Sequence, residues 1–179
     1  MKRKLTVILL AAALCLVLMC MAACNPLLSD ISKAQKNAVQ NAVTFNCTAT
    51  VADRGVTVYV YSKTLTVMSD SMSVTTAEST LNSSFVLEEK SVSEELQPDR
   101  SLIKTVDLSA KNVAEATEAE GGVSCKVTAD KLSAVLGTEI TAEGDAQVFA
   151  AMQDGVLNSV TVTFTTQGKT VTLEYKYSY

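Results

Sequence analysis

Cys47 and Cys125 are the two residues whose type and position in the folded part of the chain could form a covalent bond. Both lie in segments where apolar and polar residues alternate, so both thiols are expected to point inward. A disulfide would close a loop of nearly eighty residues and add about 4 kcal/mol in the chain-entropy model. The alternative is two free buried thiols that pack as small apolar groups. Sequence leaves both open, because a disulfide needs Cα atoms within about 7 Å of each other.

A further cysteine, Cys24, ends a leader with the anatomy of an export signal. Residues 2–4 are all basic, an apolar run extends from residue 5 to about residue 20, and Met21-Ala22-Ala23 precedes the cysteine. A basic start, an apolar core and small residues before a cleavage point are typical of secreted proteins. Cys24 is therefore the residue at which processing and modification of the chain are expected.

The leader resembles the lipobox signal of bacterial lipoproteins. That resemblance implies removal of residues 1–23 and a diacylglyceryl thioether on Cys24, which two acyl chains would hold stably in a membrane. The expected location is the extracytoplasmic face of the cell membrane, lipid-anchored. Two alternatives remain: residues 5–23 are long enough to span a bilayer, and ordinary secretion needs no lipid. Residues 24–27 would be the lipidated cysteine and a short tether, and residues 28–179 a single domain.

Composition narrows the partners that the mature chain can bind. Loss of residues 1–23 removes three positive charges and no negative ones, which leaves 12 basic against 19 acidic residues and a net charge of −7. Such a surface repels nucleic acid and anionic lipid headgroups. We therefore expect no nucleic-acid partner, and contact with the membrane through the lipid anchor.

The residue types favour a protein that is not an enzyme. Histidine is absent, which removes the commonest general base and metal ligand. The cysteine spacing does not suit zinc, and the seven glycines are scattered rather than grouped in a phosphate-binding loop. We expect no catalytic residues, no metal and no cofactor beyond the lipid on Cys24. A hydrolase that acts through two carboxylates is kept as a hypothesis beside the two non-enzymatic functions given below.

Four tyrosines could form an interaction patch on paired strands. Tyr59 and Tyr61 alternate along one segment, and Tyr175 and Tyr177 alternate along another. Exposed together, they would suit a protein partner or a glycan. The alternative is ordinary cross-strand packing.

The hydrophobic period predicts an α+β domain with one helix before a curved, mostly antiparallel, half-barrel-like sheet of seven to nine strands. A helix is expected over residues 28–43, a short helix over 109–120 and another over 129–136. Ten segments have strand-like patterns, from which the sheet of seven to nine strands would be built: 45–52, 56–62, 64–69, 72–77, 81–92, 101–108, 123–128, 138–150, 156–166 and 169–178.

The order of these elements resembles the LolA-like and LppX-type lipoproteins. The resemblance rests on the anchored cysteine, the element order and the closing phrase Asp154-Gly155-Val156-Leu157 before two amphipathic strands. It implies an unclosed barrel wrapped on helices around an apolar cavity for lipid chains. It assigns no site residue.

Two functions are compatible with this sequence. One is non-enzymatic binding of an apolar or lipid ligand in a cavity between sheet and helix, since a helix of about 16 residues cannot cover eight strands. The other is a structural or protein-interaction module of the cell envelope, with no small-molecule ligand.

Overall fold

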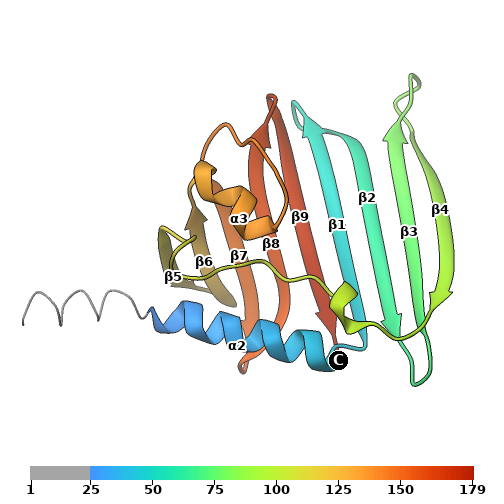
Figure 1. Ribbon diagram of the computed structural model, residues 1–179. Coiled ribbons are helices and arrows are strands. Elements are labelled where there is room, and N and C mark those ends of the chain that lie inside the picture. The colour runs from blue at the N-terminus through green and yellow to red at the C-terminus, as the bar shows by residue number, and fades with distance from the viewer. Residues whose placement is uncertain (1–24) are drawn as a thin grey trace, which may run out of the picture.

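An open antiparallel sheet of nine strands is the main feature of the computed structural model, which describes residues 25–179 (Figure 1). The leader and Cys24 lie outside the described residues. The helices are α2 (Pro26–Asn41) and α3 (Leu132–Leu136), with short 3-10 turns η1 (Arg100–Leu102) and η2 (Ala129–Lys131). The strands are β1 (Thr44–Asp53), β2 (Val56–Val67), β3 (Met72–Leu81), β4 (Leu87–Leu96), β5 (Glu115–Ala119), β6 (Gly122–Val127), β7 (Ala146–Gln153), β8 (Val156–Thr166) and β9 (Lys169–Ser178).

The first four strands run from the middle of the sheet to one edge, and the last five run from the opposite edge back to the middle. The strand order is β4-β3-β2-β1-β9-β8-β7-β6-β5. The first meander ends at the β4 edge, and residues 97–114, which we call the crossover, carry the chain across one face to the β5 edge (Figure 1). The second meander returns until β9 pairs with β1. The predicted α+β class and curved antiparallel sheet are confirmed.

Local sequence explains where α2 begins and which face it buries. The Asn25 side chain accepts a hydrogen bond from the Leu27 N–H, and Pro26 occupies the first turn, where its missing N–H costs nothing. The buried residues Leu28, Ile31, Ala34, Gln35 and Ala38 recur at helical spacing. The predicted helix is confirmed, and it lies two residues earlier at both ends than residues 28–43.

Two predicted elements in the middle of the chain are wrong. Residues 101–108, expected as a strand, belong to the crossover: Ile103, Val106 and Leu108 are buried, but their backbone pairs with no strand of the described chain. Residues 109–120, expected as a helix, contain a turn and strand β5. The Glu120-Gly121 turn lets this segment pair with β6, and that pairing outweighs the helix propensity of its Ala and Glu residues.

Several predicted strand boundaries are also wrong. Residues 56–62 and 64–69 are one strand, β2, and the segment 81–92 is divided by a turn before β4. The strand expected over 138–150 begins only at Ala146, because residues 138–145 form a loop. The closing hairpin of β8 and β9 has the expected bounds within a few residues.

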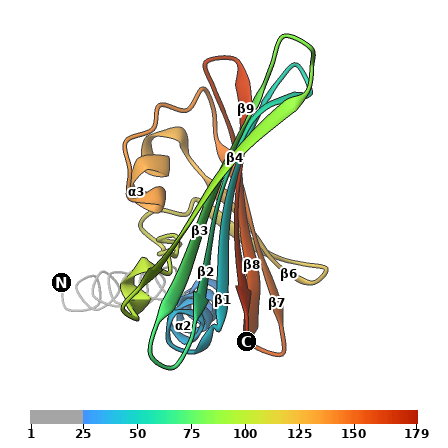
Figure 2. The same cartoon turned by 90° about the vertical axis from the view of Figure 1, so that its right-hand side faces the viewer.

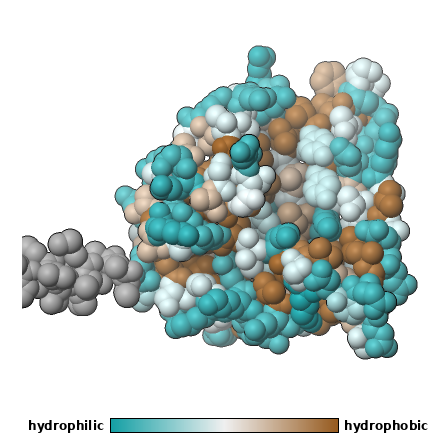
Figure 3. All heavy atoms as spheres, viewed as in Figure 1, coloured by the Kyte–Doolittle hydropathy of each residue, from teal (hydrophilic) through white to brown (hydrophobic). Residues whose placement is uncertain are grey.

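The helices and the crossover lie on one face of the sheet and cover only part of it (Figure 2). Helix α2 packs against β8 and β5, and side chains with at most 2% exposure, such as Ile31, Phe45 and Val160, fill the space beneath. Strands β2, β3 and β4, which we call the uncovered half, have no helix along most of their length (Figure 1). All ten residues of β4 are exposed. Apolar residues reach the surface over this half (Figure 3).

Candidate functional site

The candidate site is a groove between α2 and the crossover, which we call the α2 groove. It consists of two neighbouring cavities of about 460 and 650 Å³ that share Ser32, Gln35 and Asp107 in their walls. The first cavity begins at Asn25 and Pro26, and the second extends to α3. Both volumes are in the range of small-ligand sites, about 300–1,000 Å³.

Gln35 is a buried polar residue of the groove with a hydrogen-bond donor that is unpaired within residues 25–179. Its side chain is 8% exposed, and its Nε2 has no hydrogen-bond partner among the described residues. The Ser109 Oγ, which also belongs to the first cavity, is likewise buried without a partner there. A buried donor without an acceptor costs roughly 1–3 kcal/mol. An acceptor in the groove, such as a carbonyl oxygen, would remove that cost.

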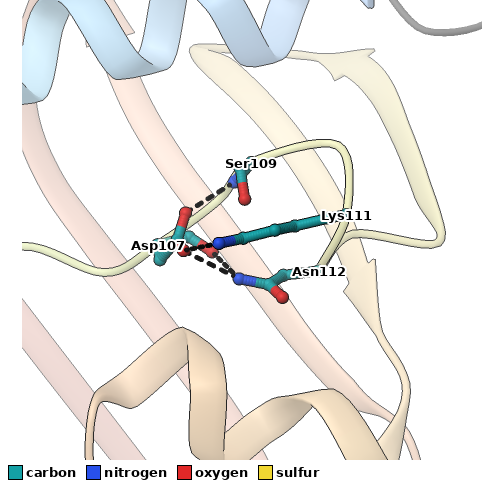
Figure 4. Close-up of polar contacts among 4 residues, drawn as sticks. All are labelled: Asp107, Ser109, Lys111 and Asn112. Atoms are coloured by element: carbon teal, nitrogen blue, oxygen red, sulfur yellow. Dashed lines mark hydrogen bonds and ion pairs between the residues drawn. The ribbon is translucent and has the colours of Figure 1, made fainter.

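An Asp107 cluster shapes the wall opposite α2 (Figure 4). The Asp107 carboxylate accepts hydrogen bonds from the Ser109 N–H at 3.2 Å and from Asn112 Nδ2 at 2.9 Å, and Lys111 Nζ lies 3.4 Å from it. Asn112 is 5% exposed and also donates to the Asp107 carbonyl. All partners lie within five residues of Asp107, so the cluster fixes the turn that forms this wall.

The protonation state of Asp107 fits this structural role. Burial raises the pKa of the carboxyl, but the Ser109 hydrogen bonds and the Lys111 charge lower it more, so the pKa lies below its ordinary value. The carboxylate therefore stays ionised near neutral pH and is a poor proton donor or acceptor for catalysis.

The remaining walls are apolar along the groove and basic at its far end. Leu28 and Leu108 face the first cavity, and Val135 faces the second. Lys36 and Lys104 also belong to the second cavity, and neither forms an ion pair within residues 25–179. The arrangement suits a molecule with an apolar part, a hydrogen-bond acceptor and a negative charge.

The two cysteines considered for a disulfide are free among the described residues. Cys47 lies on β1 and Cys125 on β6, with β9, β8 and β7 between them. Four strand spacings separate them by about 19 Å, which excludes a bond in this fold. Burial raises the pKa of Cys47, with a smaller opposing effect of the Lys63 charge, and burial raises the pKa of Cys125 to about 11.

The four tyrosines share one face of the sheet but differ in environment. Tyr175 and Tyr177 are 8% and 4% exposed, and both rings pack against Phe45. Burial raises the pKa of Tyr175 to about 12. Tyr59 and Tyr61 lie half-buried on β2, opposite Val51 and Ala49 of β1. Only this second pair remains accessible to a partner.

Sequence reasoning did not single out the residues of the α2 groove. One signal was present, since Gln35 lies seven residues after Leu28 and four after Ile31, in the apolar stripe of the helix. A polar residue at such a position needs a hydrogen-bond partner. Asp107 and Ser109 gave no comparable signal, because the apolar spacing of residues 101–108 predicted a strand rather than a loop that lines a groove.

Comparison with known proteins gives no assignment: no protein-family model matches the chain, and no curated protein matches its sequence. Within residues 25–179, no helix is both long and apolar enough to cross a membrane. The same residues contain no cluster of three His, Cys, Asp or Glu side chains arranged to hold a metal ion.

Proposed function

We propose that the protein is a lipid-anchored, extracytoplasmic binding protein that holds an amphipathic, lipid-like ligand in the α2 groove without catalysing a reaction. The observation that carries this proposal is the Gln35 amide, a donor that is 8% exposed and unpartnered among the described residues in a cavity of about 460 Å³. Its natural partner is an ester or carboxyl oxygen of a ligand.

The rest of the groove fits the same class of ligand. An acyl chain would lie between Leu28 and Leu108, where it removes apolar surface from water. A carboxylate or phosphate would lie near Lys36 and Lys104, whose charges have no ion-pair partner in the described part of the chain. These two lysines are local exceptions on a surface that is acidic as a whole.

The proposed anchor brings the groove close to the source of such a ligand. The groove begins at Asn25, the residue directly after Cys24, and α2 begins at Pro26. A diacylglyceryl group on Cys24 would therefore hold the groove within a few residues of the bilayer, with no long linker between them. Lipids of that bilayer are within reach.

The test uses the full chain purified from membranes in detergent. Solvent extraction followed by mass spectrometry should release a co-purifying lipid, and a fluorescent fatty acid should bind in competition with it. Gln35→Leu should weaken fatty-acid binding by about tenfold, the equivalent of 1.4 kcal/mol, while the fold stays as stable or becomes more stable because a buried unpartnered amide is removed.

Asn41→Leu is the matched control, because it makes the same kind of change on the exposed side of α2. It should leave binding unchanged. No extractable lipid and equal fatty-acid binding by both variants would overturn the proposal. That outcome would favour the competing hypothesis, an interaction module of the cell envelope without a small-molecule ligand.

A further inference from the structure

The β4 edge of the sheet is long and regular, and no strand within residues 25–179 pairs with its outer side. All ten residues from Leu87 to Leu96 are exposed and pair in continuous register with β3, with no proline and no bulge. One side of this strand therefore presents free backbone N–H and C=O groups. The opposite edge is the five-residue strand β5, half as long.

Apolar side chains are concentrated on and beside the β4 edge. Five of the nine exposed large hydrophobic residues in the described chain lie between positions 85 and 96: Phe85, Val86, Leu87, Val92 and Leu96. Val92 is 72% exposed in the middle of the strand. Charged residues on an edge strand hinder its pairing with other sheets, whereas exposed apolar residues favour such pairing. Prevention of unwanted pairing therefore does not explain the apolar residues of β4.

The hairpin tip beside the edge holds Phe85 in an unfavourable conformation. Phe85 has φ of 60° and is 81% exposed, a combination that costs a bulky residue about 1–3 kcal/mol. The Asn82 side chain accepts hydrogen bonds from the N–H groups of Ser84 and Val86, and it donates to Glu88 at 2.7 Å. The loop is thus fixed, and it presents an aromatic ring to solvent.

We propose that the β4 edge and the Phe85 tip form a docking surface for a basic, extended segment of a partner protein, which adds to the sheet as a further strand. Backbone hydrogen bonds would supply affinity, as in other cases of strand addition. The charge of β4 selects the partner: Glu88, Glu89, Glu94 and Glu95 outnumber its single Lys90. Lysine or arginine side chains at alternate positions would lie on one face of the added strand and meet two of these carboxylates, either Glu88 with Glu94 or Glu89 with Glu95. Phe85 would cover the end of the added strand.

The same charges argue against a second copy of this chain as the occupant. In an antiparallel pair centred between Ser91 and Val92, Glu88 would lie opposite a copy of Glu95, and Glu89 opposite a copy of Glu94. Like charges directly opposite each other destabilise a strand pair. Anionic lipid surfaces are disfavoured for the same reason.

The experiment measures binding of synthetic peptides to the full chain in detergent by fluorescence anisotropy. The probe is a ten-residue peptide of alternating lysine and valine. The control peptides replace lysine with glutamate, or replace two valines with proline, which cannot donate to a strand ladder. Only the first peptide should bind, and salt should weaken its binding.

Matched variants of the protein identify the edge that is used. Glu89→Lys with Glu94→Lys should weaken binding of the basic peptide by about tenfold or more, whereas Glu115→Lys with Glu118→Lys on β5 should not. Phe85→Gly should also weaken binding while it raises the melting temperature, because glycine accepts the positive φ. A purely structural role of Phe85 would not produce that combination.

Three results would overturn the proposal. The first is equal binding of the basic and acidic peptides, or no binding of either. The second is concentration-dependent dimerisation that Glu89→Lys with Glu94→Lys alters, which would assign the edge to a second copy. The third is binding of phosphatidylglycerol vesicles that Phe85→Gly abolishes, which would assign the tip to a membrane. None of these outcomes bears on the lipid extraction that tests the α2 groove.

Discussion

At the scale of single residues, Tyr177 fixes the crossover to the sheet. Its ring is 4% exposed and lies 5.4 Å from that of Phe45, centroid to centroid. Its hydroxyl donates a hydrogen bond to the Lys104 carbonyl at 2.8 Å. A residue of the last strand thereby holds a segment more than seventy positions earlier, next to the second cavity of the α2 groove. Such single bonds hold residues 101–108 in place, because no strand of the described chain pairs with them.

Tyr177→Phe should lower the free energy of unfolding by about 1 kcal/mol, because the Lys104 carbonyl loses its donor while the packing of the ring is kept. Urea unfolding followed by circular dichroism measures the change. Tyr179→Phe is the control: its hydroxyl donates to the Leu157 carbonyl at 3.0 Å, but the residue is 49% exposed and water can replace the bond. A larger loss in Tyr179→Phe than in Tyr177→Phe would contradict this account.

Cys125 makes stability depend on alkaline pH. Burial raises the pKa of its thiol from 9.0 to about 11, so between those values the unfolded thiol loses its proton while the folded one keeps it. The free energy of unfolding is independent of this group below pH 9 and falls as pH rises to 11, by about 1 kcal/mol per pH unit. Urea unfolding at half-unit steps of pH should show this slope.

Cys125→Ala should flatten that slope more than Cys47→Ala does. The pKa of Cys47 is also raised by burial, but the Lys63 charge opposes the effect. Tyr175, whose pKa burial raises to about 12, adds its own loss of stability only above pH 10. Burial also raises the pKa of Tyr177, so the slope above pH 10 includes both tyrosines. If both alanine variants retained the full slope between pH 9 and 10, the thiols would not be its source.

At the scale of elements, Arg100 joins the crossover to the end of α2. Its guanidinium donates hydrogen bonds to the carbonyls of Val39 at 3.1 Å and Ala42 at 3.0 Å. The last carbonyls of a helix lack partners within the helix and carry partial negative charge. A cation from a distant segment satisfies them here. The same contact places η1 beside α2 and so sets where the crossover begins.

Arg100→Ala should lower the free energy of unfolding by about 2 kcal/mol, since it removes hydrogen bonds from a charged group and a favourable charge at the helix end. Arg54→Ala, in the turn between β1 and β2, is the control: its side chain is 95% exposed and should contribute almost nothing. Thermal and urea unfolding measure both. Equal losses in the two variants would show that the contact with α2 is not stabilising.

Regular elements were predictable from sequence, and the crossover was not. The period of two in β8 and β9 and the apolar stripe of α2 are local signals, and both predictions are confirmed. Residues 101–108 have strand-like apolar spacing, but Tyr177 and Arg100 bind this region to other elements. Those contacts join residues about sixty to seventy positions apart. The pattern of residues within one segment does not reveal them. The α2 groove lies between two such segments, so it was equally hidden.

At the scale of the whole molecule, the uncovered half of the sheet extends away from the helices. In the covered part, α2 packs against β5 and β8, and α3 and the crossover lie over the same part of the sheet (Figure 1), whereas β3 and β4 contact mainly their neighbouring strands. The two candidate binding surfaces thus lie on different parts of one sheet. The α2 groove follows α2 from Asn25 to Gln40, and the β4 edge is at the end of the sheet that α2 does not reach (Figure 1). Ligand and partner could bind at the same time.

The proposed anchor at Cys24 sets how this sheet stands on a membrane. The first half of α2 lies beside β5, since Leu27 and Asp30 share a cavity with Glu118 and Ala119. Eight strand spacings then separate β5 from β4, about 38 Å. An acyl group on Cys24 would hold the β5 edge near the lipid headgroups and leave the β4 edge facing outward. A partner protein outside the bilayer could therefore reach β4 without contact with lipid.

A fluorescent donor on Thr117→Cys should therefore be strongly quenched by an acceptor lipid in the bilayer, and one on Val92→Cys only weakly. Both positions are exposed, and the native thiols Cys47 and Cys125 have raised pKa values that slow their labelling at neutral pH. The membrane-bound full chain in vesicles is the sample. Equal quenching at the two positions would mean that the sheet lies flat on the bilayer. The β4 edge would then be too close to lipid to receive an outside partner, and its acidic residues would face headgroups that repel them.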